Sequence, residues 1–360
     1  MRLNRLLVPA TAIVLLLQLT ACGQAGGGGA ITPPQSALTN EVAGVMVFDV
    51  QALSAEDFAE TMATLEDTVM AKMPAEMVAQ IKPQGQKLTA QSQESVDKYG
   101  KFRDAFIKAG GRGMVFGMIP PSAEGEEPDT FMLLSVKPGT DPAAMQTAMT
   151  EFGEGDGPEE LTAYADGWLA VTDGPLNAAP KAGNDASAGK LTTALGGASG
   201  PVRIAFRMNE SAKAALEAAK AEPQAAMLAG LIDPLMHLDY SSVVVTFGGA
   251  PAATAKMTFD SEQQAAQFNT VYAGLLAMGQ GMLKQQVAQL KAQMPEAPEP
   301  AVVDSAFAKL QMKQSGNTLS MTLDKGFVGD AGQFAPMMLP MMMMMGGGMG
   351  GGMEMVPDQE

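Results

Sequence analysis

Between residues 41 and 325 the sequence repeats one order of predicted elements, and this repetition is the strongest constraint on the fold. Each copy reads strand, helix, helix, strand, strand, helix, strand, strand. Short turns such as Asp166-Gly167 and Ser315-Gly316-Asn317 join the strand pairs. Strands joined by short turns pair antiparallel. The sequence therefore predicts an α+β fold made of two similar copies of an antiparallel sheet with packed helices.

The first copy is predicted to span residues 41–173 and the second residues 201–325, with a linker over residues 174–200. In the second copy a helix is predicted from Asp260 to about Met294, because apolar residues recur at helical spacing. The last hairpin is predicted to pair Ala306–Met312 with Thr318–Leu323, since apolar and polar residues alternate in both segments.

The first 21 residues have the features of a secretory signal peptide. Arg2 and Arg5 precede the apolar run Leu6–Leu19, and small residues follow it. The run has 14 residues, whereas a helix that spans a bilayer needs about 20. Its last residues, Leu19-Thr20-Ala21-Cys22, resemble the lipobox of bacterial lipoproteins. The body resembles internally duplicated envelope lipoproteins of uncharacterised function, and this resemblance assigns no functional residues.

The lipobox resemblance implies that the chain is cut before Cys22 and that this cysteine is acylated. The membrane is then a partner through the acyl chains. Residues 22–40, rich in glycine and proline, are predicted to form a lipidated tether. Gly23 stands where an aspartate favours retention at the inner membrane, so the outer membrane, facing the periplasm, is the expected location.

The charge excludes nucleic acid as a partner. The full chain carries a net charge of −16, and loss of Arg2 and Arg5 leaves 21 basic against 39 acidic side chains, a net charge of −18. Such a surface repels phosphate backbones. Cys22 is the only cysteine, so the fold has no internal disulfide and depends on its core.

The chain carries no catalytic signature, and we expect no enzyme activity and no cofactor. His237 is the only histidine, and its apolar surroundings favour a structural or surface role. No nucleophile elbow, phosphate-binding loop or zinc-protease motif occurs. The acidic loop with Glu154, Asp156 and Glu159 lacks the spacing of a calcium loop, so no calcium site is predicted.

Residues 326–360 form a tail rich in methionine and glycine that is predicted to be disordered. Thioether sulfur is a soft ligand that selects Cu(I) or silver, and it also reacts with oxidants. The candidate metal ligands are Met341, Met342, Met343, Met344, Met345, Met349, Met353 and Met355. The glycine runs lack the regular spacing of a dedicated site, which favours a tail without a specific ligand.

These observations predict a lipid-anchored envelope protein with a binding or structural role. It would dock an envelope protein or hold an apolar ligand, because methionine-rich helices pack adaptably. The alternative is a buffer for soft metals or oxidants that acts through the tail.

Overall fold

A computed structural model describes residues 31–39, 41–71, 93–120, 128–152, 160–171, 188–196, 200–220, 229–293 and 299–332 of the 360-residue chain. The strands are β1 (Gly44–Phe48), β2 (Gly111–Ile119), β3 (Asp129–Val136), β4 (Leu161–Ala165), β5 (Trp168–Val171), β6 (Val202–Arg207), β7 (Leu238–Thr246), β8 (Ala252–Phe259), β9 (Lys313–Ser315) and β10 (Thr318–Asp324). The helices are η1 (Gln35–Ala37), α2 (Ala55–Met70), a helix over residues 93–108, α4 (Pro142–Phe152), α5 (Ala188–Gly196), α6 (Glu210–Lys220), α7 (Ala229–Leu235), α8 (Glu262–Gln293), α9 (Ala301–Lys309) and α10 (Lys325–Gly332).

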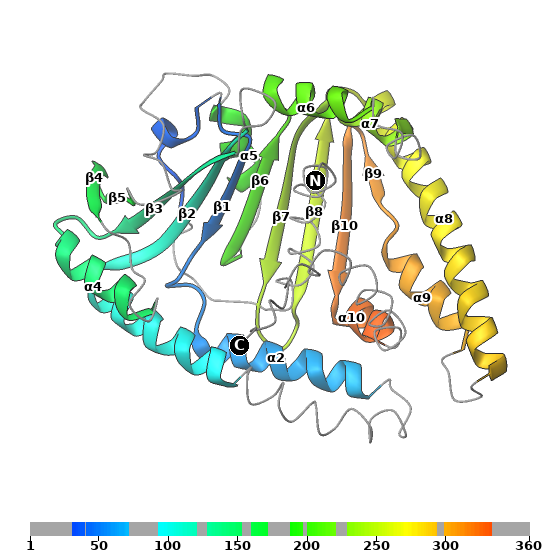
Figure 1. Ribbon diagram of the computed structural model, residues 1–360, viewed down its shortest axis with the longest axis horizontal. Coiled ribbons are helices and arrows are strands. Elements are labelled where there is room, and N and C mark those ends of the chain that lie inside the picture. Colours follow the sequence, from blue (N-terminus) through cyan, green and yellow to red (C-terminus); the bar gives the residue numbers. More distant parts are fainter. Residues whose placement is uncertain are drawn as a thin grey trace, which may run out of the picture.

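All the described strands belong to one antiparallel sheet whose order is β4-β5-β3-β2-β1-β6-β7-β8-β10-β9. Read outward from the middle, the first half runs first, second, third, fifth and fourth strand, and the second half repeats this order. The predicted α+β fold with two similar copies is therefore confirmed. Figure 1 shows β1 and β6 side by side in the middle of the sheet, with α8 beyond its β9 end.

The antiparallel pairing of β1 with β6 joins the two halves. Val45 lies opposite Ala205, and Val47 lies opposite Arg203. Helix α2 adds a second contact between the halves, because its Thr61 accepts a hydrogen bond from the Gly248 N–H at 2.9 Å. The two copies thus share one sheet.

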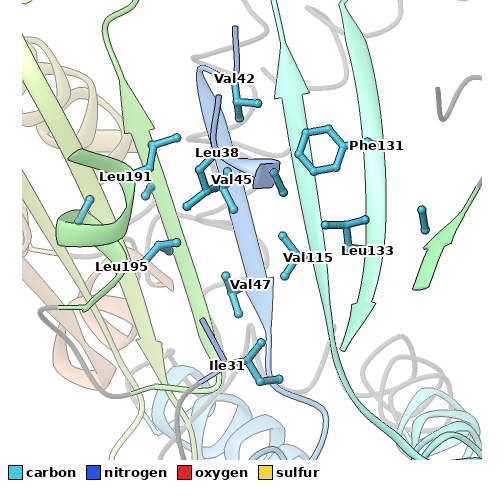
Figure 2. Close-up of a cluster of buried hydrophobic side chains, with 14 residues drawn as sticks. Ile31, Leu38, Val42, Val45, Val47, Val115, Phe131, Leu133, Leu191 and Leu195 are labelled. Atoms are coloured by element: carbon cyan, nitrogen blue, oxygen red, sulfur yellow. The ribbon is translucent and has the colours of Figure 1, made fainter. Parts of the chain in front are cut away.

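One face of the sheet is covered by the start of the described chain and by α5. Ile31 and Leu38 pack on Val45 and Val47 of β1 in a single buried cluster, to which α5 adds Leu191. Figure 2 shows this arrangement, with Leu191 and Leu195 on one side of β1 and Phe131 and Leu133 on the other. The apolar residues of segment 31–38 therefore belong to the core.

The other face is covered by the longer helices. Phe102 and Phe106 of helix 93–108 pack with Met145 of α4 over the first half. Phe268 of α8 packs with Phe259 and Leu319 over the second half. None of the described helices is both long enough and apolar enough to cross a bilayer.

Three predicted boundaries differ from the structure. Ile31 and Leu38 are buried, so the tether predicted over residues 22–40 cannot extend past residue 30. Helix α5 packs on the sheet, so residues 188–196 are not part of a linker. Lys325–Gly332 forms helix α10, so the predicted tail begins later than residue 326.

The hairpin strand predicted over Ala306–Met312 is also wrong. Residues 301–309 form α9, and the strand that forms the closing hairpin with β10 is the three-residue β9. Val303 and Ala306 of α9 are buried against Val287 of α8. Packing on α8 has outweighed the alternating pattern of the sequence.

Candidate functional site

Two buried arginines fix the start of the described chain to β6. Arg203 is 3% exposed and donates hydrogen bonds to the carbonyl oxygens of Ile31 and Leu195. Arg207 is also buried and donates to the carbonyl oxygens of Val42, at 2.8 Å, and Thr39. Each guanidinium offers several donors in a fixed plane, so it can hold two carbonyl groups at once. Three of these four bonds keep segment 31–42 against the sheet, and the bond to Leu195 holds the end of α5.

Asp49 supplies the negative charge that accompanies Arg203. It is 4% exposed, and its carboxylate accepts a hydrogen bond from the Ala52 N–H at 2.9 Å. Burial raises the pKa of the Asp49 carboxyl, against that hydrogen bond and the attraction of Arg203. Burial also lowers the pKa of the Arg203 guanidinium, against the attraction of Asp49. Because burial disfavours the charged form of each group, both charges depend on their partners.

A pocket of about 260 Å³ lies beside Ile31, where the described chain begins. Its wall includes Arg112, at a bulge of β2, and Ser135, near the end of β3. The tight turn between β4 and β5 contributes Asp166, and the first residue of β5 contributes Trp168. This turn is the one that the Asp166-Gly167 pair predicts, and Gly167 adopts the positive φ of 73° that such a turn needs.

The outer face of α8 is a second unusual surface. Met278 and Met282 are 46% and 59% exposed, although both side chains are large and apolar. At Gly274 and Gly281 an added Cβ would meet no atom of the described residues within 4 Å, so these glycines are open with respect to that part of the chain. No charged residue lies between Glu262 and Lys284. We call this surface, made of Gly274, Ala277, Met278, Gly281 and Met282, the α8 face.

The sites predicted from sequence fall mostly outside the described residues. This applies to Cys22, to the acidic loop around Asp156 and to all the candidate metal ligands of the tail, from Met341 to Met355. His237 is described: it lies between α7 and β7, is about half exposed, and its Nδ1 is 3.4 Å from a carboxylate oxygen of Asp260. In the described ranges, no three His, Cys, Asp or Glu side chains are grouped to hold a metal.

Sequence reasoning missed the two buried arginines and the pocket. Arg203 and Arg207 lie on one side of β6 with Ala205 between them, a pattern typical of a strand with one wet face. The sequence does not show that segment 31–42 covers this face of β6, and so it does not show that both arginines donate to backbone carbonyl groups there. Comparison of the chain with known protein families, curated proteins and solved structures finds no match.

We predict that Arg203→Met lowers the free energy of unfolding by roughly 3 kcal/mol, because two buried carbonyl groups and Asp49 lose their partner. Urea unfolding measures the loss, and hydrogen exchange at Ala37 and Leu38 should become faster. Lys256→Met, at an exposed position of β8, is the control. A variant within about 0.5 kcal/mol of the parent would contradict the assigned role, since that is the range of ordinary surface substitutions.

We predict that Asp49 makes stability depend on pH in an unusual direction. Because its pKa is raised on folding, the folded state binds the proton more tightly than the unfolded state. The stabilisation is present below the usual carboxyl pKa of about 3.9 and is lost as pH rises through the raised value. Asp49→Asn removes this titration and keeps an oxygen for the Ala52 N–H. Urea unfolding from pH 3 to pH 7 should show the parent losing stability relative to the variant. If the parent instead gained stability relative to Asp49→Asn as pH rises, the folded state would favour the ionised carboxylate, which contradicts the prediction.

Proposed function

We propose that this chain is a lipid-anchored protein of the bacterial cell envelope with a non-catalytic docking role. The lipobox resemblance at Leu19-Thr20-Ala21-Cys22 supports the anchor. The burial of Ile31 supports a short tether, because it leaves only residues 23–30 between the acylated cysteine and the folded body. Nine residue steps reach at most about 30 Å. The body is then held close to the membrane surface.

The open glycines of the α8 face carry the proposal of docking. A glycine inside a helix costs roughly 0.5–1 kcal/mol relative to alanine. No described residue near Gly274 or Gly281 requires a glycine there, because an added Cβ would have free space. Small residues at such spacing let a second helix approach the backbone closely. The fold does not account for this cost, and close contact with another helix does.

The occupant that the α8 face fits is the α8 face of a second copy. If two antiparallel α8 helices meet on a two-fold axis at Met278, Met282 of each copy lies opposite Gly274 of the other. The symmetry makes this contact twice, so each Met282 side chain packs on the Gly274 of the other copy. The helix has 32 residues and is about 48 Å long, which gives this contact room.

Charge also favours this surface for self-association. Two bodies with a net charge of −18 each repel one another over most of their surface. The α8 face lies in a stretch without charged residues, so contact there adds no direct like-charge pair. Anchoring in one membrane raises the effective concentration of the copies. Holding an apolar ligand is less well supported, because the pocket beside Ile31 has charged groups in its wall.

We predict that labelled palmitate enters the protein at Cys22 alone. Cys22→Ser should lose the label and keep the 21-residue leader, as shown by electrophoresis and mass spectrometry of the product. The control is the double variant Cys22→Ser with Ser36→Cys, which restores a thiol outside the lipobox and should stay unlabelled. Label in either variant would contradict the anchor.

We predict that Met278→Cys forms a disulfide-linked dimer in intact membranes. The acylated Cys22 has no free thiol, so the new cysteine is the only one available for oxidation. A two-fold axis at this position brings the two thiols together. Non-reducing electrophoresis should show a species of twice the mass, and Ala218→Cys on the exposed side of α6 should not form it.

A second change separates docking from chance collision. Gly274→Leu added to Met278→Cys should lower the dimer yield at least about tenfold, because the added side chain blocks close approach. Free space at Gly274 means that the single chain should still fold, which circular dichroism checks. No dimer at Met278→Cys, or a link only to a protein of different mass, would overturn the second copy as occupant.

A further inference from the structure

We propose that the pocket beside Ile31 binds a small zwitterion with an anionic group at one end and an amine at the other, of the type of phosphoethanolamine. Four groups of the pocket wall carry this inference: the Arg112 guanidinium, the Asp166 carboxylate, the Ser135 hydroxyl and the Trp168 indole. They come from β2, β3, the β4–β5 turn and the start of β5. Strand pairing within one sheet holds these elements around one space.

The polar groups of the pocket are available to a ligand. Within the described chain, Arg112 and Asp166 have neither a side-chain hydrogen bond nor an ion pair, although the charge of Arg112 also acts on Asp49. Ser135 lines the same pocket, and its hydroxyl has no hydrogen-bond partner in the described residues. It is not among the buried polar atoms without a partner, so its oxygen is open to a ligand as donor or acceptor.

Both signs of charge in one small pocket select a zwitterion. Arg112 suits a phosphate or carboxylate, because a guanidinium can donate two parallel hydrogen bonds to either group. Asp166 suits an ammonium, and the face of Trp168 also attracts cations. A simple anion would gain Arg112 but be repelled by Asp166. A simple cation would be attracted by Asp166 but repelled by Arg112. A volume of about 260 Å³ is enough for one such molecule and not for a long chain.

The position of the pocket favours a lipid headgroup as the source of the ligand. Ile31, in the pocket wall, is nine residues from Cys22. A glycine-rich segment of this length has a root-mean-square span of about 17 Å. The headgroup layer is therefore within reach of the pocket. An acidic body is repelled by anionic lipids, whereas a zwitterionic headgroup has no net charge. The source rests on the proposed anchor at Cys22, but the chemistry of the pocket does not.

The single tryptophan of the chain reports directly on this pocket. Phosphoethanolamine added to the purified full-length mature protein should change the Trp168 fluorescence in a saturable way. Arg112→Gln and Asp166→Asn should each weaken this binding at least about tenfold, because each removes a charge-assisted contact. Lys256→Gln, on an exposed position of β8, should leave it unchanged. Inorganic phosphate and ethanolamine, tested separately, should bind at least about tenfold more weakly than the joined molecule.

Reconstitution separates the two sources of the zwitterion. If the ligand is a headgroup, vesicles with phosphatidylethanolamine should compete with free phosphoethanolamine, and vesicles of phosphatidylglycerol should not. If neither vesicle competes while free phosphoethanolamine still binds, the pocket is assigned to a zwitterion from solution. An unsaturable fluorescence change, equal binding of inorganic phosphate, or an unaltered Arg112→Gln variant would overturn the pocket assignment. None of these outcomes depends on the α8 face.

Discussion

The antiparallel pairing of β1 with β6 is the contact on which the rest of the structure depends. Its register places Ala205 opposite Val45 and directs Arg203 and Arg207 toward segment 31–42. A slip of one residue would turn both guanidinium groups to the opposite face. The carbonyl groups of Ile31 and Thr39 would then lose their donors. One register therefore fixes the two halves, the covering segment and the place of Ile31 in the pocket wall.

Local signals were sufficient to predict most of the sheet and its helices. Ser54 caps α2 by accepting from the Asp57 N–H at 2.9 Å, and Asn209 caps α6 in the same way. The Asp166-Gly167 pair forms the turn that its sequence predicts. Each of these interactions joins residues that are close in the sequence, so it can be predicted without knowing which distant residues are in contact. The order of elements then revealed the two copies, although it did not reveal that they share one sheet.

The errors arose where distant contacts decide the structure. Residues 31–38 have the composition of a tether, but Arg203 donates to the carbonyl oxygen of Ile31, and Arg207 donates to those of Thr39 and Val42 just after the segment. Both arginines lie more than 160 residues away along the chain. Apolar and polar residues alternate over 306–312 as in a strand. However, Val303 and Ala306 also have helical spacing, and they pack against Val287 of α8. In each case an interaction across the sheet or between helices outweighed the local pattern. Composition alone cannot show such a contact, because its partner lies far along the sequence.

The two proposed surfaces are places where the chain departs from local rules without a gain inside its own fold. Helix α8 has no buried residue between Phe268 and Val287, and open glycines lie in this span. The wall of the pocket beside Ile31 holds an open hydroxyl and two opposite charges that make no ion pair in the described chain. Local rules are usually broken where a sequence serves function, because stability alone would remove such features. The partner that we propose for the glycines is an apolar helix, and the ligand that we propose for the pocket is a small molecule with both charges. The two proposed contacts differ in chemistry, so neither excludes the other.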